Sequence, residues 1–264
     1  MDTRTAIHPG TAPLDAELRD LRDVRTDTLA ADITEVDLGT TDAAVLRHLY
    51  KLAEQHLSKP SVRIHLFFKR LMDIVVGSLL ILLLLPVLVA AALATWLSSP
   101  GPVLFSHSRW ARWEKHFRCL KFRSMHVDHD RHLNKDKIAE LALKGILFKH
   151  ERDPRITAVG SFLRKTSIDE LPQLFNVLKG DMGLVGPRPL VTYMLEPFPA
   201  LRRIRGLVRP GITGLWQVND RPNNLSALQM QKYDIEYIMN VSIWLDLKIL
   251  LQTPAAVFKG DGAH

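Results

Sequence analysis

A run of 24 residues without a charged side chain, from Ile74 to Leu97, dominates the hydrophobic pattern of this chain. At about 1.5 Å per residue, a straight helix of that length would reach about 36 Å, enough to cross a bilayer core of about 30 Å. Pro86 lies inside the run, where it removes a backbone hydrogen bond and favours a kink. Three structures stay open on this pattern: a membrane-spanning helix, a re-entrant helix that breaks at Leu85-Pro86 and returns to the same face, and the core helix of a soluble protein.

Basic residues flank this run on both sides. They are Lys59, Arg63, Lys69 and Arg70 before it, and Arg109, Arg112, Lys115 and Arg118 after it. Positive residues near membrane segments prefer the cytoplasmic side. A re-entrant helix satisfies this preference at both ends, whereas a spanning helix satisfies it at one.

The N-terminal part has a different pattern. Residues 1–44 lack sustained periodicity, which predicts a tail, and their start has no apolar segment of the kind found in signal peptides. From Val45 onward, apolar residues recur at helical spacing, and this predicts an amphipathic helix that ends near Lys59-Pro60. We therefore divide the chain into a tail with an amphipathic helix (1–58), a basic flank with the membrane helix (59–98) and a third domain (99–264).

The third domain has short strand and helix patterns. Val103–Phe105 and Phe117–Phe122 predict a hairpin, and two short helices are expected around Phe162–Arg164 and from Asp169 to Gly180. Turns are predicted at Gly186–Pro189 and Pro210–Gly214. Near the end an apolar stripe, comprising Ile243, Trp244, Leu247, Leu250 and Leu251, fits an interfacial helix and a core helix equally well. The expected fold class is a membrane-associated, helix-rich α+β protein.

Composition narrows the classes of partner. The chain has 264 residues, 47% hydrophobic and 24% charged, with 35 Lys+Arg against 28 Asp+Glu and a net charge of +7. These values exclude a wholly disordered chain, and the single cysteine excludes an intrachain disulfide. A basic surplus suits an anionic membrane face or a nucleic acid. Trp110 and Trp113 follow the apolar run and fit a membrane-interface belt better than a nucleic-acid surface.

The densest polar cluster is Arg164–Gln173. Ser167 and Glu170 have the spacing of a helix-capping box. If the helix instead starts near Asp169, Asp169 and Glu170 lie at its N-terminus, where the dipole lowers the pKa of a carboxylate and attracts phosphate. Adjacent carboxylates near basic side chains could then hold a hard divalent cation together with a diphosphate. Capping and catalysis both stay open on the residues alone.

Arg188 lies between two prolines, which fixes its direction and suits a two-pronged hold on phosphate, although an ordinary surface turn has the same sequence. His126, His129 and His132 are spaced three apart in a polar stretch. With no other ligands nearby, this spacing favours a solvated loop over a metal site.

Taken in order, the motifs resemble those of the bacterial sugar transferases, the monotopic polyprenyl-phosphate hexose-1-phosphate (phosphoglycosyl) transferases. The resemblance runs from about Phe67 to near the C-terminus. The segments that carry it are Lys69–Asp73, Ser99–Pro102, Lys121–Met125, Asp153–Thr157, Leu163–Gln173, Asn176–Met182, Leu184–Pro189, Pro210–Gly214 and Gln217. Each segment is weak alone, but the ordered set is specific.

This resemblance implies transfer of a hexose 1-phosphate from a UDP-sugar, with UDP-glucose or UDP-galactose favoured, to undecaprenyl phosphate with release of UMP. It implies magnesium held at an Asp-Glu dyad, Asp169 and Glu170, with Asp169 as the nucleophile that forms a phospho-aspartate. It also implies a re-entrant helix kinked at Leu85-Pro86, interfacial helices and a catalytic domain on the cytoplasmic face of the inner membrane. The family's basic site residues correspond to Lys121, Arg164, Arg188 and Arg221.

The chain departs from the family pattern at three positions. Ala111 and Glu114 stand where the family often has glycines, and Asp220 replaces a usual glycine before Arg221. Two other functions stay open: a catalytically silent, membrane-anchored protein of polysaccharide assembly, and a basic nucleic-acid binder. We expect membrane lipid and no nucleic acid as partners, and the sequence leaves open whether the protein forms a homodimer.

Overall fold

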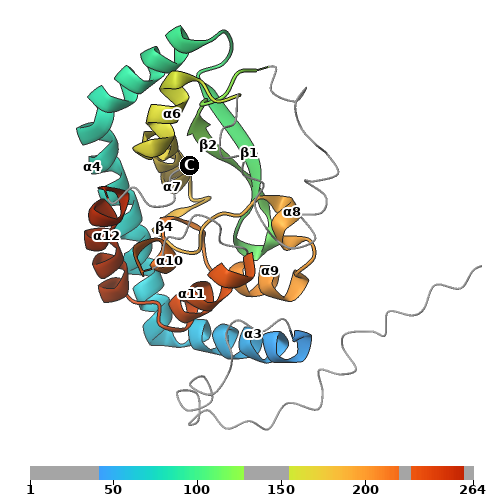
Figure 1. Ribbon diagram of the computed structural model, residues 1–264. Coiled ribbons are helices and arrows are strands. Elements are labelled where there is room, and N and C mark those ends of the chain that lie inside the picture. The colour runs from blue at the N-terminus through green and yellow to red at the C-terminus, as the bar shows by residue number, and fades with distance from the viewer. Residues whose placement is uncertain (1–41, 128–154, 220–226, 259–264) are drawn as a thin grey trace, which may run out of the picture. The chain divides into compact units, whose positions relative to one another are not determined.

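The computed structural model describes residues 42–127, 155–219 and 227–258, drawn in colour in Figure 1. The predicted tail lies almost wholly outside these residues. The longer helices are α3 (Ala43–Ser58), α4 (Pro60–Ser98), α6 (Ala158–Lys165), α11 (Ala227–Met239) and α12 (Ile243–Phe258). The shorter ones are α7 (Gln173–Lys179), α8 (Thr192–Leu195), α9 (Pro199–Arg205), α10 (Leu215–Asn219), and the 3-10 turns η2 (Arg112–Glu114) and η4 (Ile168–Glu170). The strands are β1 (Leu104–Trp110), β2 (His116–Phe122), β3 (Gly183–Val185) and β4 (Gly211–Thr213).

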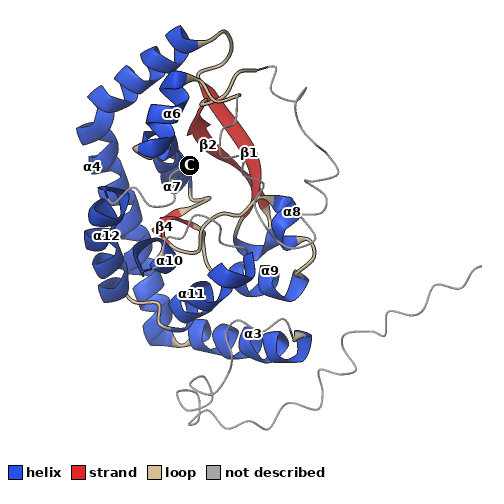
Figure 2. Cartoon of the chain, in the orientation of Figure 1, coloured by secondary structure: helices blue, strands red, loops and turns tan. Residues whose placement is uncertain are grey.

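Figure 2 shows mostly helix and a small amount of strand, as expected for a helix-rich α+β fold. In the described residues, β1 pairs with β2 in an antiparallel hairpin, and β3 pairs with β4 in parallel. The hairpin prediction is confirmed.

The amphipathic helix α3 forms where the periodicity predicts it. Its first turn is capped by the Asp42 carboxylate, which accepts a hydrogen bond of 2.7 Å from the Ala44 amide. Leu49 and Ala53 are fully buried on the side that packs against α9 and α11. Pro60 ends this helix and starts the next, since a proline in the first helical position gives up no hydrogen bond.

Helix α4 contains the long apolar run. It has 39 residues, stays helical through Pro86, and is bent along its length in Figure 1. It is long and apolar enough to cross a membrane, and only 17% of its most apolar 18-residue window is buried inside the protein. A soluble core helix would be mostly buried, so the pattern fits a membrane-associated protein. The chain does not unwind at Leu85-Pro86, and the re-entrant path stays a prediction.

Both ends of α4 contact the same folded unit. Near its start, the Arg70 guanidinium donates hydrogen bonds to the Val177 and Leu178 carbonyls of α7, at 2.7 and 3.0 Å. At its end, the Arg123 guanidinium donates to three carbonyls; they belong to Thr95, Ser99 and Pro100. The sequence presented Arg70 as a membrane-flanking charge. In the structure its guanidinium instead binds backbone carbonyls of α7.

The hairpin turn between β1 and β2 has two non-glycine residues with positive φ. Trp113 and Glu114 have φ values of 61° and 52°, in the left-handed region that favours glycine. Glu114 is thus a non-glycine residue in a left-handed conformation. Its carboxylate accepts a 2.7 Å hydrogen bond from Arg202 of α9, and this ion pair holds the strained turn in place.

The parallel pair β3–β4 corrects one prediction. Pro210–Gly214 was expected to form only a turn, but Gly211–Thr213 is a buried strand beside Gly183–Val185. A Cβ atom on Gly211 would lie 2.1 Å from the Gly186 amide nitrogen. Glycine here therefore permits two backbones to approach closely, which the sequence pattern alone could not distinguish from a turn signal.

Candidate active site

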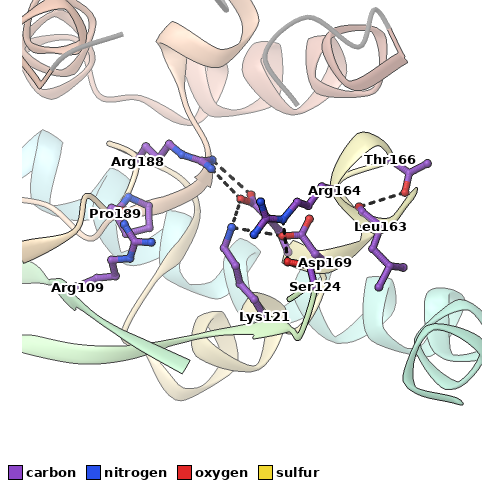
Figure 3. Close-up of polar contacts among 10 residues, drawn as sticks. Arg109, Lys121, Ser124, Leu163, Arg164, Thr166, Asp169, Arg188 and Pro189 are labelled. Carbon is purple, nitrogen blue, oxygen red and sulfur yellow. Dashed lines mark hydrogen bonds and ion pairs between the residues drawn. The ribbon is translucent and has the colours of Figure 1, made fainter. Parts of the chain in front are cut away.

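The Asp169–Glu170 dyad lies in η4, between α6 and α7 (Figure 3). Helix α6 ends at Lys165, and Ser167 then turns the chain with a left-handed φ of 57°. Because of this conformation the Ser167 side chain makes no capping hydrogen bond, so the capping-box interpretation is wrong. Helix α7 begins only at Gln173, later than the start near Asp169 that the sequence favoured.

Two of the predicted basic residues hold the dyad directly. Lys121, near the end of β2, places its Nζ 2.6 Å from Glu170 Oε1 and 3.5 Å from Asp169 Oδ2. Arg188, in the loop after β3, donates to both oxygens of Glu170, at 2.7 and 3.4 Å. In Figure 3, Arg188 approaches from the upper left and Lys121 from the strand below. The structure therefore brings together residues that are 67 positions apart in the chain, from Lys121 to Arg188.

Arg164, at the end of α6, also reaches this site. Its Nε donates a 2.8 Å hydrogen bond to Ser124 Oγ, and its charge favours ionisation of Asp169. Ser124 was not predicted as a site residue, although it belongs to the Lys121–Met125 motif. The approach is close, since a Cβ atom on Gly160 of α6 would lie 2.1 Å from the Ser124 carbonyl oxygen.

The two carboxyl groups of the dyad have opposite electrostatic environments. Burial raises the pKa of Asp169 above its ordinary value, despite the nearby Lys121 charge. For Glu170, burial also opposes ionisation, but the charges and hydrogen bonds of Arg188 and Lys121 outweigh it and lower the pKa. The expectation of a lowered pKa at Asp169 is therefore wrong. The residue lies in a buried 3-10 turn, and the N-terminus of α7, whose dipole was expected to act on it, starts four residues later.

Three further residues near the site were not predicted: Arg109 and Arg205 hold backbone carbonyls, and Asp234 pairs with Arg205. Arg109 of β1 donates to the Pro189 carbonyl at 3.3 Å, and Arg205 of α9 donates to the Arg188 carbonyl and to Asp234 of α11. The spacing of Arg205 could have revealed its burial. It lies four residues after the apolar Leu201, which puts both residues on the same, buried face of α9.

Other predicted residues are elsewhere. Arg221, His129 and His132 lie outside the described residues, so their roles stay predictions. Leu85 and Pro86 are in α4. Trp110, predicted to belong to a membrane-interface belt, instead stacks on His116 and donates its indole N–H to the Thr192 carbonyl at 3.2 Å.

The chain is similar to known proteins over most of its length. Residues 64–260 match the family described as bacterial sugar transferase. A galactosyl transferase of Streptococcus agalactiae is 44% identical over 199 residues, which cover 75% of this chain and 44% of that protein. An undecaprenyl-phosphate glucose-1-phosphate transferase of Escherichia coli K12, which uses UDP-glucose by its name, is 42% identical over 208 residues, or 76% of this chain and 42% of that protein.

A relative of more similar length comes from Caulobacter vibrioides. This UDP-glucose:undecaprenyl-phosphate glucose-1-phosphate transferase is 41% identical over 204 residues, which cover 74% of this chain and 72% of that protein. The first two relatives are longer, and the chain spans less than half of each. Because the family match includes both dyad residues and most of the sequence, the chain belongs to the bacterial sugar transferase family.

Proposed function

We propose that this protein transfers a hexose 1-phosphate from a UDP-sugar to undecaprenyl phosphate, releases UMP, and so starts the assembly of a surface glycan. The relatives from E. coli and C. vibrioides are named UDP-glucose:undecaprenyl-phosphate glucose-1-phosphate transferases. A relative from Salmonella typhimurium is named an undecaprenyl-phosphate galactose phosphotransferase. UDP-glucose and UDP-galactose are therefore the donors to test first.

The observation that carries the proposal is the unequal environment of the dyad. Glu170 is held by short contacts of 2.6 and 2.7 Å to two cations, whereas the Asp169 oxygen lies 3.5 Å from Lys121. A carboxylate that is buried and less tightly paired is the better nucleophile of the two. Glu170 is better suited to orient the two basic side chains, because its negative charge keeps Lys121 and Arg188 directed at the site.

The proposed reaction has two steps. In the first, a carboxylate oxygen of Asp169 attacks the phosphorus that bears the sugar, and the bond from this phosphorus to the UMP oxygen breaks. In the second, a phosphate oxygen of undecaprenyl phosphate attacks the same phosphorus, and the bond to Asp169 breaks. The product is a lipid diphosphate sugar, and the Asp169 carboxylate is restored.

The residues around the dyad suit a diphosphate. Lys121, Arg164 and Arg188 supply three positive charges against two carboxylates, so the site retains a surplus positive charge for an anion. Arg188 would hold phosphate oxygens in its planar fork.

Magnesium fits the dyad as a shared ion. The described residues contain no group of three or more His, Cys, Asp or Glu side chains that could hold a metal. Magnesium in phosphoryl-transfer sites is commonly bound by one or two carboxylates together with substrate phosphates, which is what Asp169 and Glu170 could offer. When bound, the ion would neutralise charge on the diphosphate.

The proposed location is the cytoplasmic face of the inner membrane, with α4 as a re-entrant helix. Near the start of α4, Lys69 and Arg70 contact β3, α12 and α7. In its second half, Leu88 and Ala91 pack with buried residues of β2 and α6, which belong to the same folded unit. A helix that crossed the membrane would have its ends on opposite faces, so docking of both ends on one unit supports a re-entrant path. On this path, undecaprenyl phosphate would reach the dyad from the lipid beside α4.

A single-turnover assay tests this function. Purified protein in nanodiscs is mixed with magnesium and each UDP-sugar in turn, without undecaprenyl phosphate. With the correct donor we expect about one UMP per active site and a hexose-phosphate adduct on the peptide that contains Asp169. Asp169→Asn serves as the matched control and should give neither.

Two other outcomes would point to another mechanism or to another function. UMP release that requires the lipid from the outset, without an adduct, would favour direct attack in a ternary complex. If Asp169→Asn and Glu170→Gln both support normal polymer production in cells, the protein acts as a silent assembly partner.

A further inference from the structure

The loop that carries Arg188 is held by its carbonyl groups. The Pro187 carbonyl accepts a 3.0 Å hydrogen bond from the Gly211 amide, and the Pro189 carbonyl accepts a 3.3 Å hydrogen bond from Arg109 Nη1. Between them, the Arg188 carbonyl accepts a hydrogen bond from Arg205 Nη2. Prolines on both sides of Arg188 have no N–H to donate, so carbonyl acceptors are the main means of fixing this backbone.

The donor to the Arg188 carbonyl is itself fixed. Arg205 is 7% exposed and faces inward from α9, beside Ile204. Its other terminal nitrogen pairs with Asp234 of α11, which is 2% exposed. A guanidinium is a rigid planar fork, so Asp234 on one arm determines where the other arm points. The pair thus links α11 and α9 to the backbone of the active-site loop.

A buried ion pair of this kind adds little to the stability of a fold, because apolar residues of the same volume often give equal stability in its place. A role in positioning explains its presence better. The Arg188 guanidinium has two neighbours. Its Nη2 lies 2.7 Å from Glu170 Oε1, and its Cζ lies over the Trp216 ring, 5.9 Å from the ring centroid. A small shift of the Arg188 backbone would move the guanidinium away from both.

We infer that Arg205 and Asp234 are positioning residues that hold the backbone of Arg188 so that its guanidinium meets the donor diphosphate in the reactive geometry. The inference rests on the proposed function, in which Arg188 binds that diphosphate. Neither Arg205 nor Asp234 contacts the dyad in the structure, so their effect on catalysis would pass through Arg188.

Two variants separate positioning from folding. Arg205→Lys keeps a positive charge opposite Asp234, but one ammonium group does not reproduce the fork. The double variant Arg205→Met/Asp234→Leu removes both charges and keeps apolar volume, so that no buried charge is left unpaired. For both we expect kcat for UMP release to fall about 10- to 100-fold, the effect of a misplaced reactive group, with a melting temperature close to the wild type.

Arg202→Met is the matched control, since Arg202 lies on the same helix and pairs with Glu114 at 2.7 Å, away from the dyad. It should leave kcat within about twofold. If both Arg205 variants are as active as this control, or if both lose the folded state, the positioning role is wrong.

A double-mutant cycle with Arg188 provides a readout that a merely structural role would not change. In an Arg188→Met background, adding Arg205→Lys should lower kcat by less than about twofold, because the group that Arg205 positions is already gone. Losses that multiply in full would overturn the inference.

Calorimetric titration with UDP distinguishes this inference from the proposed function. A wild type that binds UDP but releases no UMP from any UDP-sugar would refute the proposed function. The inference would then be judged on UDP affinity, which both Arg205 variants should weaken and Arg202→Met should not. A wild type that releases UMP, with Arg205 variants that match the control, would refute the inference alone.

Discussion

Lys69 of α4 places its Nζ 2.9 Å from the Asp246 carboxylate of α12, and both side chains are buried. The same Nζ donates a 2.9 Å hydrogen bond to the Val185 carbonyl of β3. One turn further along α4, Asp73 accepts a 2.9 Å hydrogen bond from the Leu184 amide. The first part of α4 is therefore joined to α12 by an ion pair and to β3 by hydrogen bonds.

Lys69→Met should destabilise the protein, because it leaves the Asp246 carboxylate buried without its cation. We expect a loss of about 3–5 kcal/mol, the size found when one partner of a buried pair is removed. Lys69→Met/Asp246→Leu should recover part of this loss, because the Asp246 charge is then also gone, while the buried Asp73 carboxylate, 3.6 Å from Lys69 Nζ in the wild type, still lacks its cation. Lys115→Met at an exposed position should change little. Thermal unfolding in nanodiscs measures all three variants. A double variant no more stable than Lys69→Met would contradict this account.

Both ends of α4 should lie on the cytoplasmic side, because both dock on one folded unit. Single cysteines introduced at Ser61 and Ser106, in a Cys119→Ala background, should react with an impermeant thiol reagent only after cells are opened. Labelling of one position from outside intact cells would refute the re-entrant path. Pro86→Leu should straighten the helix and favour a span, which the same assay would detect.

Asp169→Asn should abolish activity yet stabilise the fold at neutral pH. Burial raises the folded-state pKa of Asp169 above its unfolded value, so the folded state binds this proton more tightly, and stability falls as pH rises through the folded-state pKa. Asparagine removes that cost, and we expect a gain of about 0.5–2 kcal/mol. The gain should shrink toward zero at pH values below the unfolded pKa. Melting temperatures measured across pH 3–8 check this, and a loss of stability at pH 7 would refute it.

Glu170→Gln should have the opposite effect on stability. The folded-state pKa of Glu170 is lowered by Arg188 and Lys121, so the ionised group stabilises the fold above its unfolded pKa, and this contribution is lost as pH falls. We expect a loss of about 3 kcal/mol at neutral pH, because two cations lose their buried anion. Activity should also fall, but the phospho-aspartate adduct can still form. Equal stability of Glu170→Gln and wild type at pH 7 would show that the ion pairs contribute nothing.

Arg188→Lys should lower turnover about 100-fold, because lysine keeps the charge but lacks the planar fork that holds two phosphate oxygens. The melting temperature should change little, since an ammonium group can still pair with Glu170. Arg203→Lys on α9 is the control, since its side chain is 52% exposed. Equal losses in turnover and in stability would instead indicate a structural role for Arg188.

The sequence determined much of this protein locally. Apolar spacing predicted α3 and its end at Lys59-Pro60, the hairpin, and α4 as the long apolar helix, because helix and strand periodicity depend on neighbouring residues. Ordered motifs pointed to the family and to Asp169, Glu170, Lys121, Arg164 and Arg188. Four of these residues have contacts in one cluster that no single stretch of sequence could reveal, namely Lys121, Asp169, Glu170 and Arg188.

Tertiary structure alone decided the environments of these residues. The sequence could not tell that Asp169 would be buried in a 3-10 turn, which raises its pKa, or that Gly211 would bring two strands together. It likewise presented Lys69 and Arg70 as membrane-flanking charges, although both bind groups in the protein interior. Burial and pairing depend on side chains brought together from distant segments, so they follow from the packed fold and not from local spacing.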